Sequence, residues 1–424
     1  MRGTGIIPHA RPVPWQWLRL RLSGLWAGLR LPGRALPPAP ECTLPAARRT
    51  TQVRRVLVLS VSAGAGHVRA AQAIVAHAHA DFGLLDVRHV DMLTLVPGWF
   101  RKLYSDLYLK LASGLPEAWG WLYRKTDHEP GGSLPQRARR LIQRLCARRL
   151  FQLVADFAPD AIVCTHFLPA EVLGTAIAKQ EMAVPVWVQV TDFDLHHMWV
   201  HEGVTGYFIA NEELSWRLQA AGVPAGRAIV NGIPVMPGFV LRPDRGSAAA
   251  RFSLDASKTT VLMMGGGSGM GLDAMLVRRL LEQQPDIQLV VLTGRNRSLL
   301  ATLTAMVDEY PDQLRAIGFT DDVPALMACA DLAITKPGGL STSECLVAGL
   351  PMLLVNPIPG QEERNAAWLM QEGVALRADD PVTLQFRLSR LLQDRASLAR
   401  MRAKALTLAA PRAAHALLQK VASR

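Results

Sequence analysis

Residues 334–365 include the side chains of this chain that are best suited to bind a nucleotide. Two adjacent glycines, Gly338 and Gly339, allow the backbone to approach a ligand closely, and they precede a stretch of helix-forming composition. The free N–H groups and the dipole at a helix start favour an anion such as a diphosphate. Lys336 adds a positive charge at the same place, so we predict a diphosphate-binding turn here.

Glu344 follows inside the predicted helix, where its carboxylate could accept two hydrogen bonds from the cis-diol of a ribose. A plainer interpretation is also open. Residues 341–344 have the composition of a capping box, in which Glu344 would return a hydrogen bond to the helix start. The paired glycines could likewise form an ordinary tight turn.

The next loop, residues 357–365, carries Gln361, Glu362 and Asn365, a set of amides and carboxylates that suits the hydroxyl groups of a sugar. The alternative is a solvated loop and helix start. Short apolar runs at residues 333–335 and 352–355 flank the glycine turn and its helix, which indicates a strand, turn, helix, strand unit.

Two more glycine-rich turns follow predicted strands. The turn from Gly265 to Gly269 comes after the apolar run 259–264, and it either offers backbone amides to phosphate or is a flexible loop. The turn at residues 62–67 follows the run 53–60 and precedes an alanine-rich helix, which is how a doubly wound domain opens. Strand and helix alternate throughout the second half as well, so we predict an α/β fold with parallel sheets.

The turn before the first helix is a poor dinucleotide fingerprint, because Arg69 stands where a third glycine should allow close helix packing. His67 lies at the start of that helix, where the positive end of the dipole would keep an imidazole neutral and able to accept a proton. A lone histidine is more often structural than catalytic, so residue type alone does not decide its role.

The length of 424 residues suits two domains of about 150 to 200 residues each, with extensions. A formal net charge of +12 suits nucleic acid, an anionic membrane or an anionic ligand without choosing among them. No uninterrupted apolar run of about 18 residues is present, so we predict no transmembrane helix. The 5 cysteines are scattered, form no metal-binding spacing and cannot all pair, which favours a reducing compartment.

We divide the chain into residues 1–52, 53–240 and 254–424, with a linker between the last two. The first segment is rich in arginine, proline and tryptophan. It could form an amphipathic helix on a membrane surface, or it could be disordered or a targeting peptide.

Residues 93–127 interleave aromatic side chains with lysines and arginines, and the aromatic set includes Trp99, Tyr104, Trp119 and Trp121. Such a mixture suits the boundary between lipid chains and phosphates. It also suits a nucleic-acid groove, or an aromatic core beneath a basic surface.

Two stretches of the sequence resemble a known family. KPGGLSTSECLVAGLPMLLVNPIPGQEERNA in the second half and VLVLSVSAGAGHVRAAQAI in the first resemble the monogalactosyldiacylglycerol synthase and processive diacylglycerol glucosyltransferase family, which is related to the enzyme that makes lipid II. The resemblance extends over residues 53–400 or so. It implies the GT-B fold, in which two Rossmann-like domains face each other across a cleft and the last helix commonly returns to the first domain.

The resemblance implies an inverting, metal-independent transfer of a hexose from a UDP-sugar to a lipid hydroxyl, with diacylglycerol as the favoured acceptor. UDP-sugar would be a substrate, and no cofactor is expected. His67 would lie at the acceptor hydroxyl as the catalytic base, with Asp192 as the second candidate. The acceptor-binding set would be Gly66, Trp99, Tyr104, Trp119 and Trp121. The donor-binding set would be Gly265, Gly266, Gly267, Ser268, Gly269, Gly318, Phe319, Lys336, Gly338, Gly339, Ser341, Glu344, Gln361, Glu362 and Asn365.

The segment Thr191-Asp192-Phe193-Asp194 and the histidines after it allow three interpretations. Asp192 and Asp194 have the Asp-x-Asp form by which another glycosyltransferase fold holds a metal ion. The histidines could bind zinc, although the His-Glu-x-x-His spacing is absent. The family resemblance instead implies a Thr-Asp motif, with a histidine and Trp199 downstream, at the mouth of the cleft, and we favour this interpretation.

Other classes of function stay open at this point. A basic nucleic-acid-binding protein would account for the charge but not for residues 361–365, so we expect no nucleic acid partner. An epimerase, a transferase acting on a polyprenyl-linked acceptor, or a family member that binds nucleotide without turnover would share the donor half. We expect a cytoplasmic protein at the inner membrane face, bound to an anionic lipid surface, and the sequence leaves its oligomeric state open.

Overall fold

The computed structural model describes residues 55–62, 64–98, 101–102, 148–241, 243–267, 269 and 272–423, all of which belong to one unit spanning residues 43–424. Some predicted features lie outside the described residues. These are the extension at residues 1–52, the aromatic residues Trp99, Tyr104, Trp119 and Trp121, and Ser268 of the second glycine turn.

The first half of the described chain forms a six-stranded sheet in the order β2-β1-β3-β4-β5-β6, and its strand pairs are parallel. The strands are β1 Arg55–Ser60, β2 Asp86–Asp91, β3 Ala161–Cys164, β4 Val186–Gln189, β5 Gly206–Ile209 and β6 Ala228–Val230. The strand order reverses at β1, which pairs with β2 on one side and β3 on the other. Open parallel sheets bind ligands at the carboxyl ends of the strands beside such a reversal.

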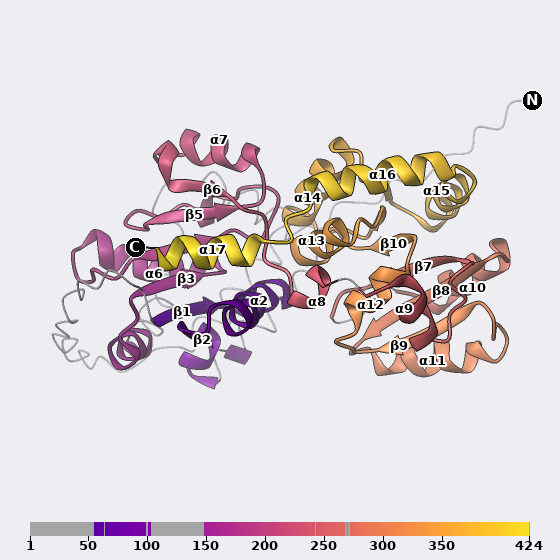
Figure 1. Ribbon diagram of the computed structural model, residues 1–424, viewed down its shortest axis with the longest axis horizontal. Coiled ribbons are helices and arrows are strands. Elements are labelled where there is room, and N and C mark those ends of the chain that lie inside the picture. Colours follow the sequence, from indigo (N-terminus) through magenta and orange to yellow (C-terminus); the bar gives the residue numbers. More distant parts are fainter. Residues whose placement is uncertain are drawn as a thin grey trace, which may run out of the picture. The chain divides into compact units, whose positions relative to one another are not determined.

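Helices connect these strands and cover both faces of the sheet (Figure 1). They are α2 Ala65–Asp81, η1 Met92–Leu95, α6 Phe167–Ala178, η2 His197–Trp199, α7 Glu212–Ala220 and η3 Ala225–Arg227. The predicted linker between the two halves holds two short helices, α8 Pro237–Val240 and α9 Arg245–Arg251.

The second half repeats the plan with a parallel sheet in the order β12-β11-β10-β7-β8-β9. Its strands are β7 Thr259–Met264, β8 Ile287–Gly294, β9 Leu314–Gly318, β10 Leu332–Thr335, β11 Met352–Val355 and β12 Ala375–Ala378. Its helices are α10 Ala274–Gln283, α11 Arg297–Val307, α12 Val323–Cys329, α13 Gly339–Ala348, α14 Gln361–Gln371, α15 Pro381–Gln393 and α16 Arg395–Leu408. Here the order reverses between β7 and β10.

The strands read as continuous apolar runs because helices cover both faces of each sheet. In β1, Leu57 and Leu59 point into one core, whereas Val56 and Val58 point into the core on the opposite face. β7 alternates in the same way between two cores of the second sheet. The prediction of doubly wound parallel domains is therefore confirmed.

The last helix, α17 Ala413–Ala422, packs on the first sheet although it follows all the strands of the second. Leu417 and Leu418 share a core with Val56 of β1, and Figure 1 shows α17 running beside that sheet. The chain reaches this position past Gly232, whose backbone has φ of +87° and at which a Cβ atom would lie 2.1 Å from the Cβ of Ala410. Only glycine fits there.

Among the described residues, no helix combines the length and the apolar character that a membrane span needs.

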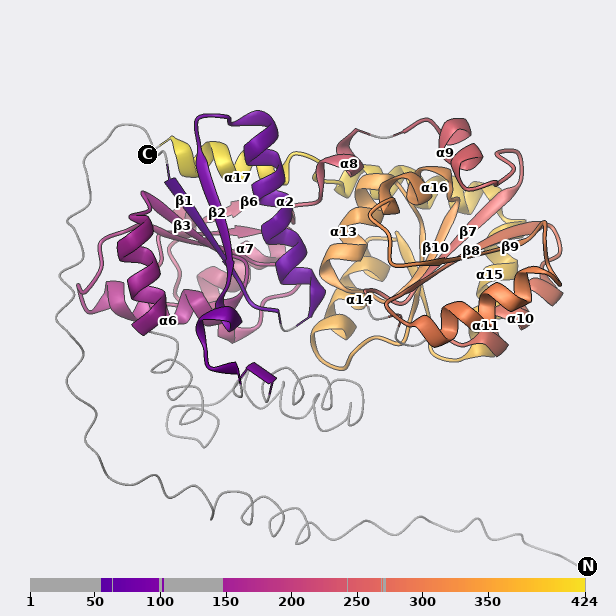
Figure 2. The ribbon, with the colours of Figure 1, turned by 90° about the horizontal axis from the view of Figure 1, so that it is seen from below.

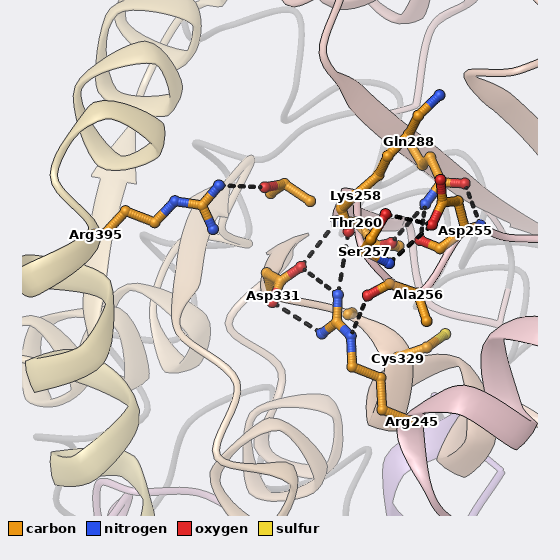
Figure 3. A network of polar contacts seen from close by, with 12 residues as sticks. Arg245, Asp255, Ala256, Ser257, Lys258, Thr260, Gln288, Cys329, Asp331 and Arg395 are labelled. Carbon is orange, nitrogen blue, oxygen red and sulfur yellow. Dashed lines mark hydrogen bonds and ion pairs between the residues drawn. The ribbon is translucent and has the colours of Figure 1, made fainter.

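A polar network ties α9 to the amino ends of β7 and β10 (Figure 3). The guanidinium of Arg245 donates two parallel hydrogen bonds of 2.9 Å to the carboxylate of Asp331. It also donates to the carbonyl oxygens of Ala256 at 3.1 Å and Lys258 at 3.2 Å. Asp331 in turn accepts from the N–H of Thr260 at 2.9 Å. This network anchors the segment between the two sheets to the second sheet, at the amino ends of its strands.

Replacing Arg245 with lysine should lower the free energy of unfolding by about 1–3 kcal/mol, because an ammonium cannot reproduce the forked bonds to Asp331. Chemical denaturation of the purified protein measures this change. Arg251→Lys is the matched control, because its pair with Asp322 lies on a more exposed part of the surface; there we expect a change within about 0.5 kcal/mol. Equal losses in the two variants would contradict a special role for the network.

Candidate active site

His67 lies in the first turn of α2, and oxygens from two neighbouring loops hold its ring. Its Nδ1 atom is 3.0 Å from the carbonyl oxygen of Thr165 and 2.8 Å from the hydroxyl oxygen of Thr191. A carbonyl oxygen can only accept a hydrogen bond, so Nδ1 must carry the proton. Nε2 therefore keeps its lone pair, and a general base needs such an atom.

Burial lowers the pKa of His67 to about 4, and the hydrogen bond to the Thr165 backbone opposes this shift in part. The imidazole is therefore neutral in the neutral pH range. The sequence predicted a neutral ring from the helix dipole, whereas burial is the main cause in the structure. The hydroxyl of Thr165 also donates to the carbonyl oxygen of His67 at 2.8 Å, so both the ring and the backbone of this residue are fixed.

A second histidine, His166, lies edge-on to His67 with the ring centroids 4.5 Å apart. Its Nδ1 accepts a hydrogen bond of 3.0 Å from the N–H of Leu168 and caps α6. Burial holds the pKa of His166 well below its usual value, and the ring of Trp199 lies 6.0 Å from that of His67. The sequence reasoning did not single out His166. Its place just after β3, the strand beside β1, is the signal that could have found it.

Asp192 is 8% exposed and lies between the two sheets. Its Oδ1 accepts a hydrogen bond of 3.3 Å from the amide of Asn365. Burial raises the pKa of Asp192 to about 7; the bond from Asn365 opposes this shift, and the charges of Glu362 and Asp194 add to it. The second candidate base thus titrates in the neutral range.

The residues after Asp192 dock on α14 of the second sheet. The ring of Phe193 stacks on that of Trp368 with 4.6 Å between centroids and an angle of 13°. The carboxylate of Asp194 pairs with Arg364 at 2.8 Å and with Arg217 at 3.3 Å. Both oxygens of Asp194 thus pair with arginines. The Asp-x-Asp interpretation needs this carboxylate as a metal ligand, so the structure does not favour it.

The histidines after this segment also have structural partners: Nδ1 of His196 accepts from the N–H of Met198 at 3.1 Å and caps η2. Within the described part of the chain, no group of three or more His, Cys, Asp or Glu side chains is placed to hold a metal ion.

Asn365, which we expected to contact the donor, instead joins the two sheets. Its side chain is fully buried. Its oxygen accepts from the N–H of Phe193 at 2.8 Å, and its amide donates to Asp192 and, at 3.1 Å, to the carbonyl oxygen of Pro337. The prediction for this residue is corrected, because protein groups already use both amide protons and the side chain has no exposed surface for a ligand.

Gly338 and Gly339 form the start of α13, with Gly338 as its N-cap. A Cβ atom at Gly339 would lie 1.9 Å from the carbonyl oxygen of Thr191, so only glycine allows this approach. A Cβ atom at Gly338 would lie 3.7 Å from Oε1 of Glu362. The first turn of α13 is therefore enclosed by the Thr191 segment and by the start of α14.

The capping-box interpretation of residues 341–344 is wrong. The cap position is Gly338, with no side-chain cap bond, and Thr342 donates to the carbonyl oxygen of Gly338 at 2.8 Å. Glu344 lies beyond the first turn and is partly buried, as is Ser341. Burial raises the pKa of Glu344 to about 7, and the positive charge of Arg69 opposes the rise.

Glu362 is 8% exposed at the start of α14, beside the partly buried Gln361. Its Oε2 accepts from the N–H of Ile358 at 2.7 Å. Burial raises the pKa of Glu362, whereas that N–H bond and the charge of Lys336 oppose the rise. Lys336 and Glu362 thus act on each other across the turn that precedes α13.

The glycine turn after β7 approaches α2. Gly266 and Gly269 have φ of +69° and +64°, and a Cβ atom at Gly269 would lie 2.1 Å from the carbonyl oxygen of Thr293. A Cβ atom at Gly267 would lie 3.7 Å from the Cβ of Ala65. Gly265 is the residue between β7 and these positions. The turn therefore needs glycine at Gly266 for backbone conformation and at Gly269 for both conformation and close packing, whereas a Cβ at Gly267 would be in ordinary contact.

Gly318 ends β9, and Phe319 follows it with 59% of its surface exposed. The guanidinium of Arg295 lies over the Phe319 ring, 5.1 Å from its centroid. Arg295 thus makes a cation–π contact with one face of the ring, and more than half of the Phe319 surface is left open to a ligand. Of the predicted acceptor-binding residues, only Gly66 is described, and a Cβ atom there would be in ordinary contact, at 3.5 Å, with Leu340 of α13.

The structure therefore brings most of the described candidates together where the carboxyl ends of the central strands of both sheets meet. His67 contacts Thr191, Thr191 contacts Gly339, and Glu362 borders Gly338. A neutral imidazole with a free lone pair lies near a helix start that favours an anion. This arrangement can take a proton from an alcohol and stabilise a phosphate leaving group.

Comparison with known proteins agrees with this geometry. Residues 67–235 match the monogalactosyldiacylglycerol (MGDG) synthase family, and residues 260–417 match the glycosyltransferase family 28 C-terminal domain. The processive diacylglycerol beta-glucosyltransferase of Bacillus subtilis (strain 168) is 28% identical over 352 residues, which cover 82% of this chain and 90% of the relative.

Two solved structures have a similar fold. MurG from Acinetobacter baumannii aligns with a TM-score of 0.55 and 16% identity, over 87% of this chain and 99% of the other. UDP-GlcNAc 2-epimerase from Neisseria meningitidis aligns with a TM-score of 0.55 and 13% identity over the same shares.

The two doubly wound sheets and the matches of both halves define a glycosyltransferase with the GT-B fold. The first half of the chain thus resembles the monogalactosyldiacylglycerol synthase family, and the second half resembles the glycosyltransferase family 28 C-terminal domain. The resemblance drawn from the glycine-histidine and GQEERN motifs is confirmed.

Asp192→Asn should stabilise the protein increasingly as the pH rises from about 4 to about 7. The folded-state pKa of Asp192 is raised, so the folded parent binds a proton at this carboxyl more tightly than the unfolded chain does. The stability that this bound proton gives the parent is lost as the pH rises through that window. The difference in free energy of unfolding between variant and parent should grow by about 1 kcal/mol or more across the window and then level off.

Denaturation midpoints measured at several pH values test this expectation. Asp286→Asn, at an exposed position, is the control for the general effect of removing one carboxylate. A difference for Asp192→Asn that is constant over the window would mean that burial does not perturb this carboxyl.

Proposed function

We propose that the protein transfers a hexose from a UDP-sugar to a lipid hydroxyl, with diacylglycerol as the acceptor and with inversion at the anomeric carbon. The family match and the diacylglycerol glucosyltransferase of Bacillus subtilis support the choice of reaction. The observation that carries the proposal is the position of Thr191. Its hydroxyl holds His67, and its carbonyl oxygen faces the start of α13 at Gly339, so one residue joins the base to the diphosphate site.

In this mechanism His67 acts as the general base. The acceptor hydroxyl gives its proton to Nε2 as its oxygen bonds to the anomeric carbon, and the bond from that carbon to the diphosphate oxygen breaks. The electron pair of that bond leaves with UDP. Attack from the face opposite the leaving group inverts the configuration. The Thr165 carbonyl oxygen, already bonded to Nδ1–H, stabilises the imidazolium that forms.

The donor site is built from the second sheet. N–H groups at Gly338 and Gly339, the glycine turn after β7 and the ammonium of Lys336 stabilise the charge that develops on the diphosphate. Glu344 binds the ribose hydroxyls, and Gln361 and Glu362 bind the hexose. Phe319 stacks on uracil, and Gly318 and Ser341 lie beside the nucleotide. These fixed groups act most strongly in the transition state, where the leaving group gains charge.

The net charge of +12 supports contact with an anionic membrane surface, where a lipid acceptor is found. The aromatic residues assigned to the acceptor lie outside the described residues; the family match and the position of His67 support the acceptor side.

The proposed reaction is tested by its product. The purified full-length chain is incubated with radiolabelled UDP-glucose or UDP-galactose and diacylglycerol in mixed micelles, with a chelator in one arm. We expect labelled glycolipid with a β-anomeric linkage from one of the two donors, and equal turnover with chelator. Absence of labelled lipid with either donor would overturn the proposal. An α-linkage would overturn inversion, and activity lost to chelator and restored by a divalent ion would overturn the metal-independent route.

His67→Gln should lower kcat by about a hundredfold or more, because the amide cannot take the acceptor proton. The affinity for UDP should stay within about twofold of the parent, because the change lies outside the donor site. Near-parental turnover in this variant would exclude His67 as the base.

The pH profile separates the two candidate bases. With the pKa of His67 at about 4, the imidazole stays competent down to about pH 5, so kcat/KM for the acceptor at saturating donor should be flat above that pH. The pKa of Asp192 is raised to about 7, so an acid limb near that value, abolished in Asp192→Asn, would assign the base to Asp192 instead.

A further inference from the structure

A second buried histidine, His166, lies beside the candidate base at the carboxyl ends of the first sheet. His67 follows β1 and His166 follows β3, and these two strands run side by side (Figure 2). The two rings meet edge to face, with 4.5 Å between their centroids. His166 comes directly after Thr165, whose carbonyl oxygen lies 3.0 Å from Nδ1 of His67. One short segment after β3 therefore fixes the base and sets another imidazole against it.

The hydrogen bond at the start of α6 decides which nitrogen of His166 carries a proton. The N–H of Leu168 donates to Nδ1 at 3.0 Å, so Nδ1 has a lone pair and no proton. Burial holds the pKa of this ring well below its usual value, so the ring is neutral in the neutral pH range. A neutral imidazole has a single N–H, which must then be at Nε2. His166 thus presents a hydrogen-bond donor, whereas Nε2 of His67 presents an acceptor.

Within the described part of the chain, the Nε2–H of His166 has no hydrogen-bond acceptor. The residue is only 2% exposed, and aromatic rings surround it: the centroids of Phe167 and Trp199 lie 4.0 Å and 6.4 Å from that of His166. Buried donors in folded proteins are nearly always paired, because an unpaired one loses its bonds to water without replacement. An oxygen of a bound substrate would supply the acceptor that this N–H lacks.

The surroundings of His166 favour the lipid acceptor over the sugar donor as the source of this oxygen. Its ring neighbours, His67, Phe167 and Trp199, all come from the segments that connect strands of the first sheet. The residues proposed for UDP follow strands of the second sheet instead. The partly buried Phe167 also adds apolar surface beside the N–H, which suits the hydrocarbon part of a lipid.

We propose that His166 is a substrate-binding residue for the lipid acceptor: its Nε2–H donates a hydrogen bond to the carbonyl oxygen of the ester next to the hydroxyl that His67 deprotonates. This inference rests on the proposed function and deepens it by assigning part of the acceptor site. Diacylglycerol carries its free hydroxyl and its nearest ester on adjacent carbon atoms, so neighbouring rings with one acceptor and one donor nitrogen match these two groups. Holding the ester orients the hydroxyl toward Nε2 of His67.

His166→Asn separates the proposed contact from the structural role of the residue. Asparagine is a strong helix N-cap whose side-chain oxygen can still accept from the N–H of Leu168, but it has no group at the place of Nε2–H. With the full-length protein and diacylglycerol in mixed micelles, we expect kcat/KM for the acceptor to fall about tenfold. The affinity for UDP, measured by calorimetry, should stay within about twofold of the parent.

A matched acceptor tests which atom the N–H contacts. Dialkylglycerol has the same hydroxyl and chains but ether links in place of the esters, so it lacks the carbonyl oxygen. The parent should use it about tenfold less well than diacylglycerol, and His166→Asn should handle it as the parent does, within about twofold. Where turnover of the diether is too slow to measure, its inhibition constant against diacylglycerol is compared between parent and variant in the same way.

His79→Asn is the matched control, because His79 is exposed on α2, and it should keep the parental kcat/KM with both acceptors. His166→Phe removes the cap as well as the N–H, so its thermal midpoint should fall below that of His166→Asn. If His166→Asn itself fails to fold, the comparison of the two acceptors in the parent still decides, because equal kcat/KM for ester and ether would exclude a bond to the carbonyl oxygen.

The inference would be overturned by a kcat/KM for diacylglycerol in His166→Asn that matches the parent, or by an equal loss with the diether. A rise in the KM for the UDP-hexose in place of that for the lipid would also overturn it. Each of these results leaves the transferase proposal intact. A parent protein that transfers no sugar to either lipid would overturn both.

Discussion

The docking of residues 191–194 against the starts of α13 and α14 is the constraint on which the rest of the site depends. Thr191 carries its carbonyl oxygen so close to Gly339 that no side chain fits there. Its neighbour Phe193 stacks on Trp368, and Asn365 bonds to both Phe193 and Asp192. Because Thr191 also touches His67, a shift in this contact moves the candidate base relative to the proposed diphosphate site.

This packing has an electrostatic cost. The carboxyls of Asp192, Glu344 and Glu362 are all buried enough for their pKa values to be raised, so each would be easier to accommodate as a neutral side chain. Such perturbed groups gather at functional sites more often than at structural ones. Arg69, Lys336 and the amide of Asn365 each offset part of this cost, and in this way the polar cluster is connected across both sheets.

Much of the fold followed from sequence patterns that are local. Apolar runs such as residues 259–264 gave the strands, the glycines after them gave the turns, and parallel sheets then bring the turns to one edge. The position of His67 at a helix start and of Gly338 at an N-cap was predictable for the same reason. These features depend on a few consecutive residues.

Most of the errors and omissions concern contacts between distant residues, and one concerns where a helix begins. Asn365 has the composition of a sugar ligand, but its partners, Phe193 and Asp192, lie more than 170 positions away. The capping box failed because α13 begins two residues before Ser341. The charge of Arg69 on Glu344 leaves no local signal, and His166 shows only its place after a strand, not its packing on His67.

The fold by itself does not choose a reaction, since a UDP-GlcNAc 2-epimerase and MurG resemble this chain to a similar extent. The decision comes from the family of both domains and from the residues at the meeting edges of the two sheets. A neutral imidazole near a helix start that favours an anion suits transfer to an alcohol.

The most direct test of this account is a crystal structure of the protein with UDP. We predict that the diphosphate lies against the N–H groups at Gly338 and Gly339 and that the ribose hydroxyls donate hydrogen bonds to Glu344. Nε2 of His67 should face the terminal oxygens of the β-phosphate. Uridine bound away from Gly339 and Glu344, or a His67 ring turned away from the phosphate, would contradict it.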